Sequence, residues 1–377
     1  MTAAAGRGLR VDRVLVVAGG GELPETAANA RHRWASRRGV LLAVEGDGVV
    51  GLGEASPLPG LSLDDVGAAG RALDDAARRL QGATLALDPA VDTLDAVSAA
   101  IDGWGIGLPP SARLAVETAL LDLVAQLRGV PLPILLGADA GARIEVSALL
   151  GDPGEDGALG RGASLVAEGA RTLKLKLGGR SIADDVAAVA ALRAALGPSI
   201  TLIGDANGVW AIDDARRALE RLAPVGVGLV EQPVAPADLA ALGPVPVPVW
   251  ADESLTVAAT RGEVLALPHL AGVALKPTVL GGLGAARAIA REALARGLGV
   301  AVTHALEGPV ALRACAALAL ALAPGAARAG VWPHRGLAAW PDLGPVSIGP
   351  VLGIAPGAGL GLTACDRALL LGPGGTR

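Results

Sequence analysis

The chain has 377 residues, of which 52% are hydrophobic and 18% are charged, a balance that supports a large buried core and argues against disorder. Its net charge of −5 provides no basic face, which argues against a nucleic-acid partner. The longest apolar run, residues 314–323, is about half a membrane span, and residues 14–18 are too short for a signal-peptide core. With only two cysteines, Cys315 and Cys365, both expected as buried thiols, we predict a cytoplasmic protein without a membrane partner.

The first 135 residues predict an α+β domain. Residues 11–17 and 39–45 are typical of strands, and residues 49–53 predict a third strand that pairs with the second across the turn Gly46-Asp-Gly48. Between the first two strands, residues 19–38 are rich in glycine and arginine, and we expect a loop there.

Two helices are expected to follow in this domain. Residues 62–80 and, more strongly, residues 111–129 carry apolar side chains at helical spacing. The second helix is predicted to begin with Ser111 as its N-cap and to carry Glu117 and Asp122 on its polar side.

From residue 143 onward a strand–helix unit repeats. Apolar segments typical of buried parallel strands alternate with amphipathic helices such as residues 183–196 and 211–222. The predicted strands are residues 144–149, 172–177, 200–205, 227–231, 247–252, 272–276 and 299–303, with a weaker eighth at residues 329–332.

Seven to eight such units favour a closed barrel over an open sheet. The predicted fold class is therefore α/β, a modified TIM-type (β/α) barrel with an N-terminal α+β capping domain that the C-terminal tail completes. We predict a cap over residues 1–135, a catalytic barrel over residues 136–345 and a C-terminal segment, residues 346–377, that packs back on the cap.

Lysine is almost absent from the chain. Of 32 lysines and arginines only three are lysines, Lys174, Lys176 and Lys276, and each lies in a strand-like apolar segment. A desolvated ammonium group can lose its proton, whereas a guanidinium group effectively cannot. The three lysines therefore indicate a proton-transfer site; the alternative is chance retention of three exposed lysines.

A charged residue ends five consecutive predicted strands. These residues are Lys176, Asp205, Glu231, Asp252 and Lys276, and the gaps between them are 29, 26, 21 and 24 residues. Each gap fits one strand–helix unit, and in a barrel the carboxyl ends of the strands form one rim where active sites lie. We therefore expect these five side chains to converge.

Lys174 and Lys176 are two residues apart on one strand and should point to the same face, whereas Leu173, Leu175 and Leu177 should point towards the helices. Two neighbouring ammonium groups lower each other's proton affinity, which favours one of them as a general base near neutral pH. The alternative is a solvated edge strand that carries two lysines.

Three acids at one rim would repel one another unless a cation lay between them. Asp205, Glu231 and Asp252 offer oxygen ligands without histidine or cysteine, a set that favours Mg²⁺, or Mn²⁺, over zinc. Asn207 is predicted either to contact the substrate or to support a metal ligand, and Glu253 to point away from the ion and orient a lysine. Salt bridges to barrel arginines are the alternative use of these acids.

A carboxylate substrate fits such a ring, because a divalent ion acidifies the α-proton, a lysine removes it and the ion stabilises the enediolate that forms. Thr303 and His304, at the seventh strand end, are predicted to contact the substrate, although His304 is equally typical of a plain loop histidine. His32, His269 and His334 are predicted to be surface or loop residues.

Five short segments carry a family resemblance. They are Lys174-Leu-Lys176, Asp205-Ala-Asn207, Glu231-Gln-Pro233, Asp252-Glu-Ser254 and Lys276-Pro277. In these segments the sequence resembles the enolase superfamily, in its muconate-lactonising subgroup, and the likeness extends over nearly the whole chain; a lysine base paired with Mg²⁺ is known from that superfamily. Within the subgroup it is most similar to the o-succinylbenzoate synthases, in residues 53–62, 250–255 and 275–282.

The resemblance implies an Mg²⁺-dependent hydro-lyase of menaquinone biosynthesis, which dehydrates 2-succinyl-6-hydroxy-2,4-cyclohexadiene-1-carboxylate to 2-succinylbenzoate. It implies that Lys176 removes the α-proton and returns it to the departing hydroxyl, that Lys174 positions the carboxylate, and that Lys276 stabilises the intermediate by cation–π contact. The N-terminal domain would cover the barrel mouth, with residues 19–38 and 53–62 shaping the substrate pocket.

Other activities would use the same residues. A racemase of N-succinylamino acids or a dipeptide epimerase would employ Lys176 and Lys276 as opposed bases, although the lack of Asp-x-Asp after the seventh strand argues against the epimerase. The segment 303–308 departs from the expected serine-rich turn, and the cap carries leucines such as Leu61 in place of expected aromatic residues. A barrel kept only for binding is disfavoured because all the ionisable groups are intact. A small-molecule carboxylate is the one partner predicted, and no oligomeric state is predicted.

Overall fold

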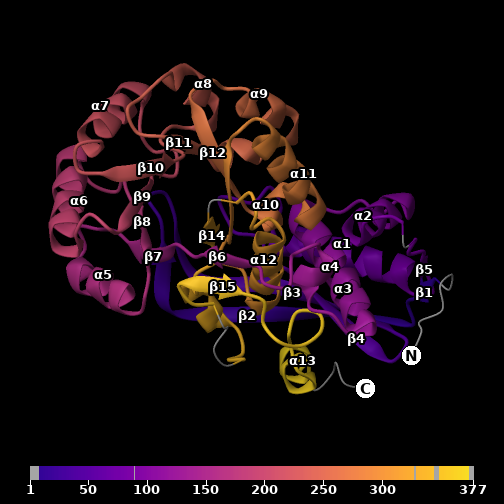
Figure 1. The fold of residues 1–377 in the computed structure, drawn as a ribbon. Helices are drawn as coiled ribbons and strands as arrows, with labels where there is room; N and C mark the ends of the chain where they lie inside the picture. The colour runs from indigo at the N-terminus through magenta and orange to yellow at the C-terminus, as the bar shows by residue number, and fades with distance from the viewer. Residues whose placement is uncertain (1–7, 89, 327, 344–347, 373–377) are drawn as a thin grey trace.

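The amino-terminal part of the chain forms an antiparallel sheet packed against helices (Figure 1). In the computed structural model, which describes residues 8–88, 90–326, 328–343 and 348–372, the strand order of this sheet is β2-β3-β4. The elements of this cap are β1 (Leu9–Arg10), β2 (Arg13–Ala28), β3 (Arg33–Gly46), β4 (Val49–Ala55), α1 (Val66–Leu80), β5 (Thr84–Leu85), α2 (Thr93–Gly103), α3 (Pro110–Arg128) and α4 (Leu132–Leu135).

The predicted hairpin between β3 and β4 is present. Asp47 and Gly48 join the strands with φ values of 48° and 75°, the left-handed conformation that a two-residue hairpin turn requires. The predicted loop over residues 19–38 is wrong, because β2 and β3 pair through most of that stretch. Many of its side chains lie on the exposed side of the sheet, so glycine and arginine are tolerated there without breaking the strands.

Helix α3 lies directly on this sheet. A Cβ atom at Gly51 or Gly53 of β4 would overlap the backbone carbonyl of Ala119 or Ala115, so these two glycines allow the close approach. The helix is buried on nearly all sides and ends at Gly129, which adopts the left-handed conformation with φ 68°.

Three details of the α3 prediction are wrong. Glu117 and Asp122 are buried rather than solvated, because other parts of the chain supply their hydrogen-bond donors. Pro109, not Ser111, is the N-cap, and the Ser111 hydroxyl donates instead to Asp64 at 2.5 Å.

Eight parallel strands form a nearly closed barrel, which confirms the predicted fold class. The sheet runs in chain order, and a bridge between Val146 and Ala329 brings its first and last strands together. The strands are β7 (Ala148–Gly151), β8 (Thr172–Lys176), β9 (Thr201–Asp205), β10 (Val227–Glu231), β11 (Val249–Ala251), β12 (Leu270–Leu275), β13 (Gly299–Thr303) and β14 (Arg328–Gly330).

The first predicted strand, residues 144–149, divides in two. Its beginning belongs to β6 (Arg143–Glu145), which pairs antiparallel with β15 (Val351–Gly353) of the C-terminal segment, and only its end enters the barrel as β7. Periodicity could not reveal this division because the partner strand is about 200 residues away.

Helices surround the barrel (Figure 1). Leu173, Leu175 and Leu177 are buried in the apolar layer that continues towards the helices, as predicted, whereas Ile203 and Trp250 belong to a separate apolar cluster of inward-facing residues. The helices are α5 (Ala158–Ala167), α6 (Ile182–Leu196), α7 (Ile212–Leu222), α8 (Leu239–Leu242), α9 (Arg261–Leu265), α10 (Pro277–Leu280), α11 (Gly282–Ala295) and α12 (Pro309–Ala321).

The C-terminal segment returns to the cap. Leu360 N donates to the Asp122 carboxylate at 2.8 Å, and Arg367 of α13 (Ala364–Leu371) forms an ion pair with the same carboxylate at 2.6 Å. The boundary that we propose between residues 345 and 346 falls outside the described residues. Cys315 is buried as predicted, but Cys365 is exposed, because it lies on the solvent side of α13.

No helix among the described residues combines the length and the apolar composition needed to cross a membrane.

Candidate active site

Strand register brings the predicted strand-end residues to one level of the barrel. Lys176 pairs with Asp205, Asp205 with Glu231, and Glu231 with Trp250, which precedes Asp252 by two residues. Carboxylate oxygens of Asp205, Glu231 and Asp252 all lie within 4.8 Å of one another. The three acids therefore converge at the carboxyl ends of neighbouring strands.

All three lysines contact this cluster of acids. Lys174 Nζ lies 2.5 Å from Glu231 and 3.0 Å from Asp205, and Lys176 Nζ lies 2.6 Å from Asp205. Lys276 donates to Asp252. We call these six residues, three acids and three lysines, the lysine–carboxylate ring.

The ring is buried, which makes its internal charge pairing strong. The side chains of the three acids are at most 6% exposed, whereas that of Lys176 is 21% exposed and is the most accessible of the lysines. Burial alone would lower the pKa of Lys174, but Asp205 and Glu231 outweigh burial and raise it. Burial alone would raise the pKa of Asp205, but Lys174 and Lys176 hold it well below its usual range.

Asn207 and Glu253 extend the ring. Asn207 accepts a hydrogen bond from Lys176 Nζ at 3.1 Å through its side-chain oxygen and donates to Glu253 at 3.0 Å through its amide nitrogen. Burial and then the neighbouring Asp252 raise the pKa of Glu253 to about 7. In this geometry Glu253 reaches a ring lysine through Asn207.

Gln232 is a buried part of the site to which the sequence prediction gave no role. Its side-chain oxygen accepts from the backbone N–H groups of Asp252 and Ser254, and its amide nitrogen donates to Val234 O and the Ser254 hydroxyl. Its φ of 38° is unusual for a residue other than glycine. Gln232 therefore ties the ends of β10 and β11 together; the sequence signal was its place directly after Glu231.

The seventh strand end brings two further predicted residues close to the ring. Thr303 is buried, and its hydroxyl donates to Gly330 O at 3.0 Å. Burial, then His334 and then the three ring lysines lower the pKa of His304. The prediction that His334 is a surface or loop residue is wrong in one respect, because its side chain is buried against His304, with ring centroids 4.1 Å apart.

The cap closes over this end of the barrel. Arg31, at the β2–β3 turn, donates to Gly208 O at 2.6 Å, next to Asn207. An apolar cluster joins the cap to the loops that follow β12 and β13, and Trp34 lies in it where the sequence suggested only leucines. The members of this cluster are Ala27, Trp34, Leu58, Val279 and Ala305, with Leu23, Leu61 and Leu306 packed against them.

Two family models match the chain. Residues 24–137 match the N-terminal domain of mandelate racemase and muconate lactonizing enzyme, and residues 159–367 match the enolase C-terminal domain-like family. The second match alone covers more than half of the chain. The chain belongs to the enolase superfamily.

Relatives within the superfamily catalyse different reactions. Muconate cycloisomerase 1-2 of Acinetobacter lwoffii is 36% identical over 55% of this chain and 55% of its own length, so the chain matches about half of that relative. The o-succinylbenzoate synthase of Desulfotalea psychrophila is 32% identical over 74% of this chain and 81% of its own length.

A solved structure with a third activity has a similar fold. The dipeptide epimerase of Enterococcus faecalis, in a complex with Mg and the dipeptide L-Leu-L-Tyr, superposes with a TM-score of 0.79 at 25% identity, over 93% of this chain and 99% of its own. The comparisons therefore establish an enolase-superfamily enzyme and leave its reaction among lyases and isomerases.

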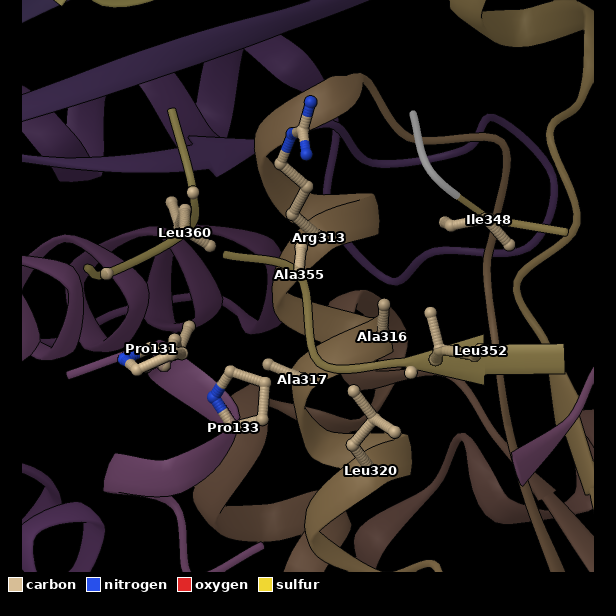
Figure 2. A pocket seen from close by; sticks show the side chains of 14 residues that line it. Pro131, Pro133, Arg313, Ala316, Ala317, Leu320, Ile348, Leu352, Ala355 and Leu360 are labelled. Atoms are coloured by element: carbon tan, nitrogen blue, oxygen red, sulfur yellow. The ribbon is translucent and has the colours of Figure 1, made fainter. Parts of the chain in front are cut away.

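The chain also has a surface pocket that lies away from the lysine–carboxylate ring. Figure 2 shows it between α12, the start of α4 at Pro131 and Pro133, and the C-terminal segment around Leu352 and Leu360. Among the described residues that line it, Arg313 is the only charged one, and no member of the ring contributes. A pocket of this composition offers no proton-transfer chemistry, so the ring remains the candidate active site.

Proposed function

We propose that this enzyme dehydrates 2-succinyl-6-hydroxy-2,4-cyclohexadiene-1-carboxylate to 2-succinylbenzoate, the reaction of an o-succinylbenzoate synthase in menaquinone biosynthesis. The observation that carries the proposal is the convergence of Lys176 and Lys276 on the acids Asp205, Glu231 and Asp252 in one buried ring. The choice of reaction is supported by the Desulfotalea psychrophila synthase, which aligns with about three quarters of the chain.

The three acids fit a divalent cation. They are buried, all their donors are oxygens, and their carboxylates lie close enough to share one ion, which is the donor set that Mg²⁺ or Mn²⁺ prefers. We propose Asp205, Glu231 and Asp252 as the Mg²⁺ ligands. When bound, the ion supplies positive charge beside the substrate carboxylate and so acidifies the neighbouring C–H bond.

We assign the proton transfer to Lys176. Its side chain is the most exposed of the three and comes from the end of β8, so its amine, in the neutral form that a base requires, can reach both solvent and a substrate above the ring. In the proposed reaction Nζ of Lys176 takes the proton from C1 of the substrate. The C6–OH bond then breaks, and the same proton leaves with the hydroxide as water, so that atoms and charge balance.

The other polar residues would bind and orient the substrate. Lys174, held between Glu231 and Asp205, keeps positive charge under the substrate carboxylate, and Lys276 faces it from the β12 side. Asn207 and Glu253 would orient Lys176, and Thr303 and His304 would border the substrate from the β13 side. The apolar cluster around Trp34 would exclude water from above, and residues 19–38 and 53–62 of the cap contribute its wall.

A second candidate is a 1,1-proton transfer on an N-succinylamino acid or a dipeptide. The observation that favours it is the placement of Lys176 at the end of β8 and of Lys276 directly after β12. The strands β9, β10 and β11, whose carboxyl ends carry the three acids, lie between them. Two lysines on opposite sides of a substrate would act as the two bases of such a racemase or epimerase.

The assay that separates these candidates uses the full chain with Mg²⁺ in deuterated water. We expect 2-succinylbenzoate to form from the cyclohexadiene substrate, and no deuterium to enter the α-position of N-succinylamino acids or dipeptides. Deuterium exchange into the amino acid derivatives without turnover of the cyclohexadiene would favour the second candidate.

The Lys176 assignment is tested by substitution. We expect Lys176→Ala and Lys176→Arg to lower kcat by about 10²- to 10⁴-fold, the contribution typical of general acid–base catalysis. Arg171→Ala is the matched control, because Arg171 immediately precedes the same strand at its opposite, solvent-exposed end. Activity of Lys176→Ala close to that of Arg171→Ala would contradict the assignment.

A further inference from the structure

A second cluster of ligand-type side chains lies beside the ring, in the loops that follow β13 and β14. His304, Glu307 and His334 each offer one nitrogen or oxygen atom, and these atoms all lie within 4.8 Å of one another. None of the three belongs to the lysine–carboxylate ring. We call them the His–Glu–His cluster.

His334 lacks partners in a buried position. Its residue surface is 7% exposed, and neither of its ring nitrogens has a hydrogen-bond partner among the described residues. A buried polar group without a partner destabilises the folded state, so an interaction with a ligand would remove that penalty. Gly336 packs against the imidazole of His334. A Cβ atom at Gly336 would come within 2.9 Å of His334 Nδ1, so this close packing restricts the orientation of the imidazole.

Glu307 is held in place for coordination. The residue is fully buried; one carboxylate oxygen accepts from the Thr278 hydroxyl at 2.6 Å and the other from Ala305 N at 2.6 Å. Each carboxylate oxygen has a further lone pair, so these bonds orient the group without exhausting it. Hydrogen bonds of this kind to a carboxylate are typical around metal ligands.

The charges around the cluster have both signs: Arg37 and the ring lysines oppose a cation there, and the buried carboxyl groups of Glu307 and Glu54 favour one. The guanidinium group of Arg37 interacts electrostatically with both Glu54 and Glu307, so one arginine faces two buried carboxyl groups. Its own hydrogen bonds go to the carbonyl oxygens of Ser56, Pro57 and Leu306. In the neighbouring ring, three lysines already match three acids.

We propose that His304, Glu307 and His334 form a binding site for Zn²⁺ or a similar divalent transition-metal ion, with one coordination position open. Two imidazoles and one carboxylate are a ligand set that Zn²⁺ accepts in tetrahedral geometry, and Mg²⁺ prefers oxygen ligands. Bonds of about 2.0–2.1 Å require the ligand atoms to approach to roughly 3.3 Å of one another, so atoms at the present upper limit of 4.8 Å must come closer by about 1.5 Å. The long contact from Leu306 N to His304 Nδ1, 3.3 Å, is weak enough to give way.

The proposal concerns a site outside the ring and does not depend on which reaction the ring performs. An ion there would join the loops after β13 and β14 at the place where Arg37 of the cap reaches Leu306. Its proposed role is to fix the wall of the active site next to Thr303.

The test measures Zn²⁺ binding to the full chain while excess Mg²⁺ occupies oxygen sites. Titration calorimetry and elemental analysis after dialysis should give one Zn²⁺ per chain for the wild type and for Asp205→Asn. In His334→Gln and His304→Gln the affinity should fall by at least about tenfold, since even loss of a residue that supports a ligand costs 10- to 100-fold. His269→Gln is the matched control, because His269 lies elsewhere and contacts Leu239 O.

A spectroscopic readout separates coordination from a merely structural role. With Co²⁺ in place of Zn²⁺, the wild type should show the visible absorption of a four-coordinate site with nitrogen ligands, and His334→Gln should lack it. Wild-type protein that retains no Zn²⁺ would overturn the proposal. So would Zn²⁺ that is lost in Asp205→Asn but kept in both cluster variants, because the ion would then occupy the ring. If His334→Gln fails to fold, His304→Gln alone decides between these outcomes.

Discussion

At the scale of single residues, the ring is a balance of three positive and three negative side chains. Lys174 and Lys176 both contact Asp205. Lys174 also contacts Glu231, and Lys276 contacts Asp252, so each of the six has a side chain of opposite charge beside it. Buried charges without such partners are costly. This explains why a chain that otherwise uses arginine keeps its lysines here: an ammonium group is compact enough to share one carboxylate with a second ammonium group and can give up its proton.

Gln232 carries a prediction at this scale. Gln232→Met keeps the volume but leaves the N–H groups of Asp252 and Ser254 without their acceptor. We expect Mg²⁺ affinity, measured by titration calorimetry, to fall by about 10- to 100-fold, because Asp252 loses the contact that orients it.

The control for Gln232 is Gln126→Met. Gln126 is half-buried and likewise donates through its side chain, to Val50 O and Asp122 O, but it lies in α3, away from the ring. The Gln126→Met substitution should change the free energy of unfolding and leave the Mg²⁺ affinity unaltered. Equal losses of affinity in both variants would show that Gln232 acts through general stability.

At the scale of elements, the sequence predicted correctly those features that follow from the regular spacing of residues along the chain. The repeat of strands and helices placed Asp205, Glu231 and Lys276 at strand ends, and parallel strands in one barrel must bring such ends to one rim. The alternation of Lys174 and Lys176 with leucines likewise predicted which face each side chain takes.

The failures share a physical cause, which is dependence on distant partners. Asp122 and Glu117 have the local pattern of solvated helix residues, yet Asp122 accepts from Leu360 N, 238 residues away, and Glu117 from Gly284 N. His334 likewise follows a strand in a loop-like segment, and only the fold reveals that it is buried against His304. The spacing of apolar residues in a helix or strand carries no information on contacts between residues that are far apart in the chain.

The contact between β4 and α3 carries the prediction at this scale. Gly53→Ala would place a methyl group on the carbonyl oxygen of Ala115, so the helix must move off the sheet. We expect a loss of about 1–3 kcal/mol in the free energy of unfolding, measured by urea denaturation, as for other overpacked sites.

Gly107→Ala is the matched control for Gly53→Ala. A Cβ atom at Gly107 meets nothing within 4 Å, and its backbone does not adopt a positive φ. It should leave stability within about 0.5 kcal/mol of wild type. A Gly53→Ala protein as stable as the control would mean that α3 can shift without cost.

At the scale of the whole molecule, buried carboxylates connect cap, barrel and C-terminal segment. Glu54 of β4 accepts hydrogen bonds from the N–H groups of Gly308, Val310 and Ala311, so a cap residue closes the N-terminus of barrel helix α12. Asp122 of α3 joins Leu52 of the cap to Arg367 of α13. The cap is therefore tied to the barrel mouth by groups that lie outside the ring.

Arg367 carries the prediction at this scale. Arg367→Met leaves the buried Asp122 carboxylate without its cation, a change that typically costs about 3–5 kcal/mol. Urea denaturation should show that loss, and hydrogen exchange should show faster exchange in α13 and β4 than in the barrel strands.

Arg38→Met is the comparison for Arg367→Met. The Arg38–Glu22 pair is largely exposed, and such pairs contribute about 0–1 kcal/mol. If the two substitutions had equal effects, the Asp122 pair would not hold the C-terminal helix in place.

The confinement of lysine to the ring has a practical consequence for studying this enzyme. An amine-directed reagent finds only three side chains in the whole sequence, and all three lie in the ring. Reductive methylation with ¹³C-formaldehyde preserves their charge, so each dimethylated amine would give its own NMR signal. Apart from the α-amino group, the spectrum would report the lysine–carboxylate ring alone, and Lys176, whose side chain is the most exposed, would acquire its label first.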